Sequence, residues 1–260
     1  MKVSLLTSTP NATRMMWVAY RTCYSKDSPQ QLWERTNEMA DEEIEKFLAR
    51  MFETEHTSPQ RHIYFGFGIT DVSRALSHQL VRHVIGVSHS QQSQRYVDGE
   101  FFNSIEPPSI LKNENAHKDF QSELHESKYA YQRLQELGVE NEDARFILPN
   151  ATSTCLVSTF SYEALRNFCN KRLCSQAQWE IKELARAMKK EVAAISPFLS
   201  SYLGPTCAPK CKGMCSEPYN KYLKCKSGRP HKTGLLATWA AQRACEKSIE
   251  AIGDYPPEGC

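Results

Sequence analysis

The densest group of polar side chains that could do chemistry spans residues 79–95. Its two arginines, Arg82 and Arg95, flank a run of hydroxyl, imidazole and amide side chains at residues 88–94. A guanidinium offers paired donors to a phosphate or carboxylate, and serine hydroxyls add short neutral donors. The spacing therefore favours a cradle for an oxyanion, although a run of this kind taken alone also fits a solvated polar loop.

A second group joins one arginine in an expected loop to side chains on an expected helix. Arg145 stands before a Leu-Pro step, while Asn167 and Arg172 lie five residues apart. That spacing makes the last two near neighbours around a helix without placing them on one row. The group could bind an anion, or its arginines could be surface residues that pair with Glu163 or with helix carbonyls.

The fingerprints of common cofactor and metal sites are missing. The Gly66-Phe67-Gly68 segment lacks the third glycine of a dinucleotide-binding turn and falls inside an expected strand. Neither a Gly-Lys-Ser/Thr phosphate loop nor a His-Glu-x-x-His zinc motif occurs. Four thiolates at Cys207, Cys211, Cys215 and Cys225 could close a zinc site, but intervals of three, three and nine residues do not match its common spacing. We therefore predict no resident metal and interpret the ten cysteines as thiols.

Hydrophobic periodicity predicts the elements that must position these side chains. The segment Ser28-Pro29-Gln30-Gln31 has the pattern of a capping box, which predicts a helix as far as Met39. A helix with one apolar stripe is expected over residues 41–52, and a strand of alternating apolar residues over 62–69.

Beyond that strand, Asp71 is expected to cap a helix that runs toward His83, and a polar loop follows from Gly86 to Gln92. The remaining pattern predicts a long amphipathic helix at 117–137, a buried strand at 152–158, and helices around 165–172 and 177–192. Strands that alternate with long helices indicate an α+β or α/β body.

Length, charge and composition limit the class of protein. A chain of 260 residues, 40% hydrophobic and 24% charged, suffices for one large folded domain or two small ones. A formal net charge of +2 excludes a strongly basic protein that coats nucleic acid. No apolar run approaches the ~18 residues of a membrane helix, and the N-terminal segment lacks a signal-peptide core. We expect a cytoplasmic protein with no membrane or nucleic-acid partner.

Several segments together resemble one known family. Arg82-His83-Val84, eight residues and then Ser93-Gln94-Arg95 resembles the signature of flavin-dependent thymidylate synthases, usually Arg-His-Arg, seven or eight residues, then Ser. The resemblance extends in order from Met1 to about Cys215. It includes MKVSLLTSTP at the start, His56-Thr57-Ser58-Pro59, Asp143-Ala144-Arg145, Leu148-Pro149-Asn150-Ala151-Thr152, Asn167-Phe168, Ala177-Gln178-Trp179-Glu180-Ile181 and Gly204-Pro205.

The resemblance implies an α+β fold in which a mixed sheet packs with long helices in a single domain, residues 1–203. A basic, cysteine-rich extension, residues 204–260, is expected to pack on the same domain. The resemblance also implies a homotetramer with active sites shared between subunits, and FAD bound without a Rossmann fold. The implied reaction methylates dUMP at C5 to dTMP, with methylenetetrahydrofolate as carbon donor and NADPH as reductant.

The same resemblance implies roles for individual residues. Arg172 would be the catalytic residue, because a fixed cation at the uracil ring stabilises the negative charge that makes C5 nucleophilic. The residues that would bind dUMP are Gln79, Arg82, Gln91, Gln92, Ser93, Gln94, Arg95, Arg145 and Arg172. Those that would contact FAD are His56, Ser58, Arg82, His83, Gln91, Ser161 and Asn167.

Four residues depart from the pattern of that family, and they cluster on the expected flavin and folate side. Val84 replaces the second arginine of the signature, Arg61 stands at a usually acidic position, Glu163 replaces a common arginine, and Gln176 replaces a frequent His or Arg. Two alternatives therefore stay open. One is a paralogue that modifies C5 of another pyrimidine nucleotide such as UMP, and the other is a non-catalytic nucleotide-binding protein that has lost flavin.

Overall fold

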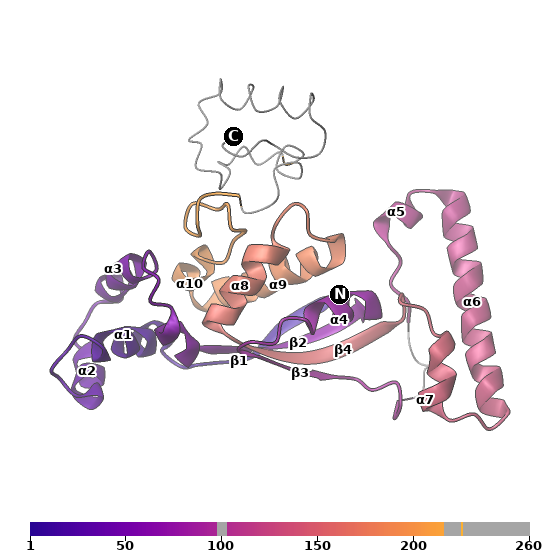
Figure 1. Cartoon of the computed structure of the whole chain (residues 1–260), viewed down its shortest axis with the longest axis horizontal. Helices are drawn as coiled ribbons and strands as arrows, with labels where there is room; N and C mark the ends of the chain where they lie inside the picture. Colours follow the sequence, from indigo (N-terminus) through magenta and orange to yellow (C-terminus); the bar gives the residue numbers. More distant parts are fainter. Residues whose placement is uncertain (98–102, 216–224, 226–260) are drawn as a thin grey trace, which may run out of the picture.

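The computed structural model describes residues 1–97, 103–215 and 225 (Figure 1). Strands and helices both occur along this part of the chain, and the predicted α+β class is confirmed. The strands are β1 (Lys2–Ser8), β2 (Tyr64–Ser73), β3 (Val87–Gln91) and β4 (Ser153–Ser161). The helices are α1 (Ala12–Thr22), α2 (Pro29–Thr36), α3 (Asp41–Met51), α4 (Arg74–Leu80), α5 (Pro108–Leu111), α6 (Glu114–Glu136), α7 (Asn141–Ala144), α8 (Tyr162–Arg172), α9 (Trp179–Ile195) and α10 (Pro197–Ser201), with 3₁₀ helices η1 (Ser58–His62) and η3 (Arg145–Ile147).

The strands form one sheet in the order β1-β2-β4-β3. The expectation of a mixed sheet is wrong, because every strand pair in the described residues is antiparallel. Strand direction depends on how the connecting segments return the chain to the sheet. Hydrophobic periodicity reports which face of a strand is buried and carries no information on its direction.

Helices α4, α8 and α9 pack on one face of the sheet (Figure 1). Fully buried side chains from alternate positions of β2, among them Phe65 and Phe67, form the sheet side of this layer. Phe160 of β4 meets Phe168 of α8, with 5.5 Å between the ring centroids. The core therefore fixes α8, which ends at Arg172, and α4, whose C-terminal end leads to Arg82, on the same face of the sheet.

Two predicted helices are confirmed, one of them together with its predicted N-terminal cap. Ser28 Oγ accepts a hydrogen bond from Gln31 N, and Gln31 Oε1 accepts one from Ser28 N, so the capping box opens α2 as predicted. The helix expected over 117–137 is α6, which stands apart from the sheet (Figure 1). Tyr131 is its one buried residue, and the other apolar side chains on this side of the helix, among them Phe120, Leu124 and Leu134, are partly buried in the single chain.

Asp71 does not cap the helix that follows β2, contrary to the prediction. It adopts a left-handed backbone conformation, with φ of 56°, at an irregularity of β2 between Ile69 and Val72. The cap is Ser73, whose Oγ accepts from Leu76 N. Aspartate and serine are both favoured caps, and only the pairing of β2 with β4 shows which of them ends the strand.

The polar segment after Gly86 is not the predicted loop but the edge strand β3, which pairs with β4 from Val87–Phe160 to Gln91–Leu156. An edge strand with polar side chains lacks the apolar alternation that predicts a strand. The pattern also left β1 and α1 without a prediction.

Gly86 has a left-handed conformation, with φ of 71°, and an added Cβ would lie 2.5 Å from Ser161 Oγ. We expect Gly86→Ala to lower the free energy of unfolding by about 2–3 kcal/mol, because backbone strain adds to a clash with a buried residue. Gly138→Ala is the matched control, since its φ is 84° but its added Cβ meets no described atom within 4 Å. This control should lose only about 1 kcal/mol in urea denaturation. Equal losses in the two variants would contradict the clash.

Candidate functional site

Arg172, His83 and Gln79 meet where α4 and α8 end. Arg172 Nε donates to His83 Nε2 at 3.1 Å, and a terminal guanidinium nitrogen donates to the Gln79 carbonyl oxygen at 3.3 Å. Burial and the nearby charge of Arg82 lower the pKa of Arg172. Residues some 90 positions apart in the sequence thus form one group, which we call the Arg172 group: Gln79, Arg82, His83 and Arg172.

His83 is held in its neutral form within the Arg172 group. Burial, and then the charge of Arg172, lower the pKa of His83 from its ordinary value of 6.5 to about 4. Because its Nε2 accepts from Arg172, the ring proton of the neutral form lies on Nδ1. The ring packs edge-on against Phe168, with 5.0 Å between centroids. The imidazole therefore orients Arg172 without adding another positive charge.

We expect His83 to make the protein less stable as the pH falls from about 6.5 toward 4. A histidine whose pKa is lowered by folding binds a proton more readily in the unfolded chain. Its stabilising contribution is therefore present above pH ~6.5 and is lost as the pH approaches the folded value. Thermal unfolding between pH 4 and 7 measures this loss. His83→Gln lacks the titrating ring, so its melting temperature should depend less on pH in this window, and an equal dependence would refute the assignment.

A second group of charged side chains lies at the other end of α4. Arg95 forms an ion pair with Glu142, and Arg145 Nε donates to the Glu142 carbonyl oxygen at 3.0 Å. Arg74 begins α4, and burial and the charge of Arg145 lower the pKa of Arg74. We call these residues the Arg145 group: Arg74, Arg95, Glu142 and Arg145. Sequence reasoning missed Arg74, although this residue starts the helix that was expected to carry site residues.

The end of β3 connects α4 to the sheet between the two groups. Gln91 Nε2 donates to Ser77 Oγ on α4 and to Thr154 Oγ1 on β4, each at 3.1 Å. The turn that follows carries the remaining predicted nucleotide-binding residues: Gln92, Ser93, Gln94 and Arg95. Guanidinium, amide and hydroxyl donors at the two ends of α4, roughly 10 Å apart for a seven-residue helix, suit a ligand with an anionic group and a polar planar ring.

The predicted flavin residues lie in several places. Asn167 lines a cavity of about 630 Å³, and so does Thr57, which stands between His56 and Ser58. Ser161 is buried, and its Oγ accepts from Ala164 N as the cap of α8. The other three predicted flavin residues belong to the α4 end and to β3: Arg82, His83 and Gln91.

Two of the four departures from the family pattern contact each other. Arg61 Nε donates to the Glu163 carboxylate, and Thr57 Oγ1 donates to the same carboxylate. Val84 is 69% exposed beside the Arg172 group. Gln176 is exposed and lines a separate, smaller cavity. The two charge departures therefore form one ion pair, which the sequence alone did not indicate.

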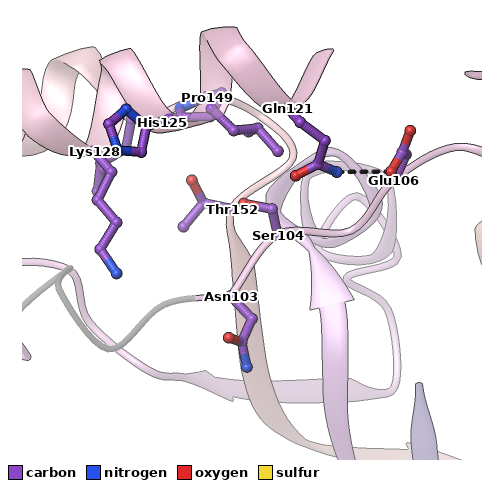
Figure 2. Close-up of a pocket in the computed structure, with 10 residues that line it drawn as sticks. Asn103, Ser104, Glu106, Gln121, His125, Lys128, Pro149 and Thr152 are labelled. Atoms are coloured by element: carbon purple, nitrogen blue, oxygen red, sulfur yellow. Dashed lines mark hydrogen bonds between the residues drawn. The ribbon is translucent and has the colours of Figure 1, made fainter. Parts of the chain in front are cut away.

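A pocket of about 510 Å³ lies between α6 and the residues that precede β4 (Figure 2). Glu106 in its wall accepts from Gln121 Nε2 and from His117 Nδ1, each at 2.8 Å. Lys128 and Thr152 also line it (Figure 2). None of the described lining residues belongs to the predicted site, so this pocket is separate from the candidate site.

No three His, Cys, Asp or Glu side chains among the described residues are arranged to hold a metal ion. Cys211 Sγ donates to the carbonyl oxygens of Tyr202 and Gly204, at 3.5 and 3.6 Å. The predicted extension is described only at residues 204–215 and 225, and its other residues lie outside the described part. Of the helices in the described ranges, none is long and apolar enough to cross a membrane.

Comparison with known proteins gives a consistent result. The family model described as "Thymidylate synthase complementing protein" matches residues 4–198. The flavin-dependent thymidylate synthase of Clostridium tetani is 38% identical over 232 residues, covering 83% of this chain and 90% of the relative. The flavin-dependent thymidylate synthase of Nitratidesulfovibrio vulgaris is 38% identical over 226 residues, covering 83% of this chain and 91% of the relative. The flavin-dependent thymidylate synthase of Sulfolobus acidocaldarius is 36% identical over 211 residues, covering 80% of this chain and 78% of the relative.

Proposed function

Because the chain belongs to the thymidylate synthase complementing protein family, whose relatives named above are flavin-dependent thymidylate synthases, we propose that it methylates dUMP at C5 to give dTMP. Methylenetetrahydrofolate is the proposed carbon donor, NADPH the reductant and FAD the bound cofactor. The observation that carries the proposal is the Arg172 guanidinium, held by His83 and Gln79 beside a second arginine.

The proposed dUMP site uses both groups at the ends of α4. A nucleoside monophosphate has a dianionic phosphate and a planar base with a polar edge. Arg95 and Arg145 offer charge-assisted hydrogen bonds to the phosphate, and Ser93 offers a neutral one. The full proposed set is Gln79, Arg82, Gln91, Gln92, Ser93, Gln94, Arg95, Arg145 and Arg172, to which the structure adds Arg74 as a candidate.

Arg172 has the proposed catalytic role. Two of its five N–H groups are used by His83 and Gln79, which leaves three for a ligand. C5 of uracil becomes nucleophilic enough to attack an electrophilic carbon when the ring carries negative charge, which is shared along its N3–O2 edge. A guanidinium fixed in advance stabilises that charge with little reorganisation. The neutral His83 keeps Arg172 in place and adds no positive charge of its own.

The 630 Å³ cavity that Asn167 lines is the proposed flavin site, and its charged lining residues are Arg166, Lys212, Glu53, Glu55 and Glu163. Arg166 lines the cavity, and it is held by a hydrogen bond from its guanidinium to Gln60 Oε1 at 2.9 Å and by the Phe52 ring at 4.9 Å. When bound, FAD supplies the redox step between NADPH and the one-carbon unit. The proposed contacts are His56, Ser58, Arg82, His83, Gln91, Ser161 and Asn167.

We also propose a homotetramer in which subunits share active sites, in the cytoplasm with the small-molecule substrates. Exposed apolar side chains near the Arg172 group and the Arg145 group support burial between copies. They are Val84 at 69%, Ile85 at 84%, Tyr96 at 78% and Phe146 at 82% exposure.

The experiment that tests the proposal is an absorbance spectrum of the purified protein. Flavin bands should shift on addition of dUMP and bleach with NADPH under anaerobic conditions, and dTMP should form once methylenetetrahydrofolate is present. A protein that stays colourless after incubation with FAD would overturn the proposal. Turnover of UMP in place of dUMP would instead favour the paralogue that modifies another pyrimidine nucleotide.

A further inference from the structure

The pocket between α6 and the residues that precede β4 has walls that contacts within the chain hold in place. Ser127 Oγ on α6 donates to the Ile147 carbonyl oxygen at 2.6 Å, which ties the helix to η3. Ser104 and Thr152, both in the opposite wall, are joined by an antiparallel β-bridge. A cavity of about 510 Å³ between such walls has the size of a preformed small-molecule site.

The carboxylate that lines this pocket is already engaged by α6. One oxygen of Glu106 accepts from His117 Nδ1 and the other accepts from Gln121 Nε2, each at 2.8 Å. The Glu106 side chain is only 11% exposed. Glu106 is therefore a fixed part of the wall at its end of the pocket.

Donor groups away from Glu106 lack such partners. Figure 2 shows His125 and Lys128 at one end of the pocket and Glu106 at the other, with Thr152 between them. Within the described ranges, Lys128 forms no ion pair. Thr152 is 3% exposed, and its hydroxyl makes no hydrogen bond with any described residue. A buried hydroxyl of this kind costs free energy unless a bound molecule pairs with it.

The charges of the lining favour one class of ligand. Lys128 is the one lysine or arginine among the described lining residues, so the pocket offers a single ammonium together with the neutral Thr152 hydroxyl. This pair of donors matches one carboxylate group. A phosphate dianion needs more than one charged donor, and it would share the pocket with the Glu106 carboxylate. The apolar lining residues, which suit a hydrocarbon body, are Leu124, Leu148 and Pro149.

We propose that this pocket is a second binding site of the protein, which takes a small organic carboxylate. The carboxylate of the ligand pairs with Lys128 and Thr152, and its hydrocarbon part lies against the apolar lining. The site shares no described lining residue with the Arg172 group or the Arg145 group, so it does not depend on the proposed function. The competing explanation is a water-filled gap between α6 and the sheet.

The test is binding of hexanoate to the full chain, measured by saturation-transfer NMR with and without dUMP. Hexanoate should bind saturably in both conditions. Hexanamide, which keeps the hydrocarbon part but lacks the charge, should bind about tenfold more weakly or less. Inorganic phosphate should displace hexanoate only at concentrations about tenfold or more above the Kd of hexanoate.

Lys128→Met should weaken hexanoate binding about tenfold or more, because it removes the charge-assisted contact. Thr152→Val keeps the shape of the side chain without the hydroxyl and should weaken binding about threefold. Lys118→Met is the matched control, because Lys118 is also on α6, is 67% exposed, pairs with Glu114 and does not line the pocket. It should leave hexanoate binding unchanged.

Three outcomes would overturn the inference: a wild-type chain that binds no hexanoate, unchanged binding by Lys128→Met, or hexanamide that binds as tightly as hexanoate. Loss of hexanoate on addition of dUMP would place the carboxylate in the candidate site and would also refute a second site. Phosphate that displaces hexanoate at or below the Kd of hexanoate would contradict the assignment to a carboxylate.

Discussion

Arg172→Ala is expected to lower kcat for dTMP formation by about 100- to 1,000-fold while FAD stays bound. The size follows from the loss of one preorganised donor to a developing negative charge. The guanidinium extends from α8 to His83 and the Gln79 carbonyl oxygen, so two hydrogen bonds hold it in one position. Turnover with saturating dUMP, measured together with the flavin spectrum, separates loss of chemistry from loss of cofactor.

The matched control for this prediction is Lys171→Ala. Lys171 is the exposed cation next to Arg172 in the last turn of α8; its charge helps to lower the pKa of His83, but its removal takes away no hydrogen bond to His83 or Gln79. We expect kcat within about twofold of the wild type. Near-normal turnover in Arg172→Ala would contradict the assignment of the catalytic role. Loss of bound FAD would mean that Arg172 acts chiefly by positioning His83, one of the proposed FAD contacts.

Glu180→Ala is expected to lower the free energy of unfolding by about 3 kcal/mol, the largest loss of stability that we predict. The side chain is 2% exposed, and its carboxylate accepts from both Ser73 N, at 2.7 Å, and Ser73 Oγ. Ser73 Oγ in turn accepts from Leu76 N as the cap of α4. Removing the carboxylate leaves buried donors unpaired and a cavity between α9 and α4.

Glu183→Ala is the control on the same helix. Glu183 is about half exposed and pairs with Arg186 one turn away, so its loss should cost no more than ~0.5 kcal/mol. Urea denaturation followed by circular dichroism measures both variants. Because α4 carries Gln79 and leads into Arg82, Glu180→Ala should also weaken dUMP binding. Equal stability of the two variants would show that Glu180 does not anchor α4.

The sequence by itself determined several of the local elements and the family. The apolar stripe of α3 and the alternation of β2 are visible in the sequence because each element buries one of its own faces. The capping box at Ser28 is visible because its two hydrogen-bonding residues are only three positions apart. The motif around Arg82 and Ser93 identified the family for a similar reason, since a short contiguous segment carries it.

Only the tertiary structure decided which distant residues meet. Arg172 contacts His83 across 89 residues, Arg61 contacts Glu163 across 102, and Glu180 lies buried against Ser73 across 107. The antiparallel directions of the strands and the edge strand β3 were likewise missed. Local patterns report how each segment packs, whereas these contacts depend on how the chain returns to the sheet. A charged side chain such as Glu163 or Glu180 shows its partner only once that path is known.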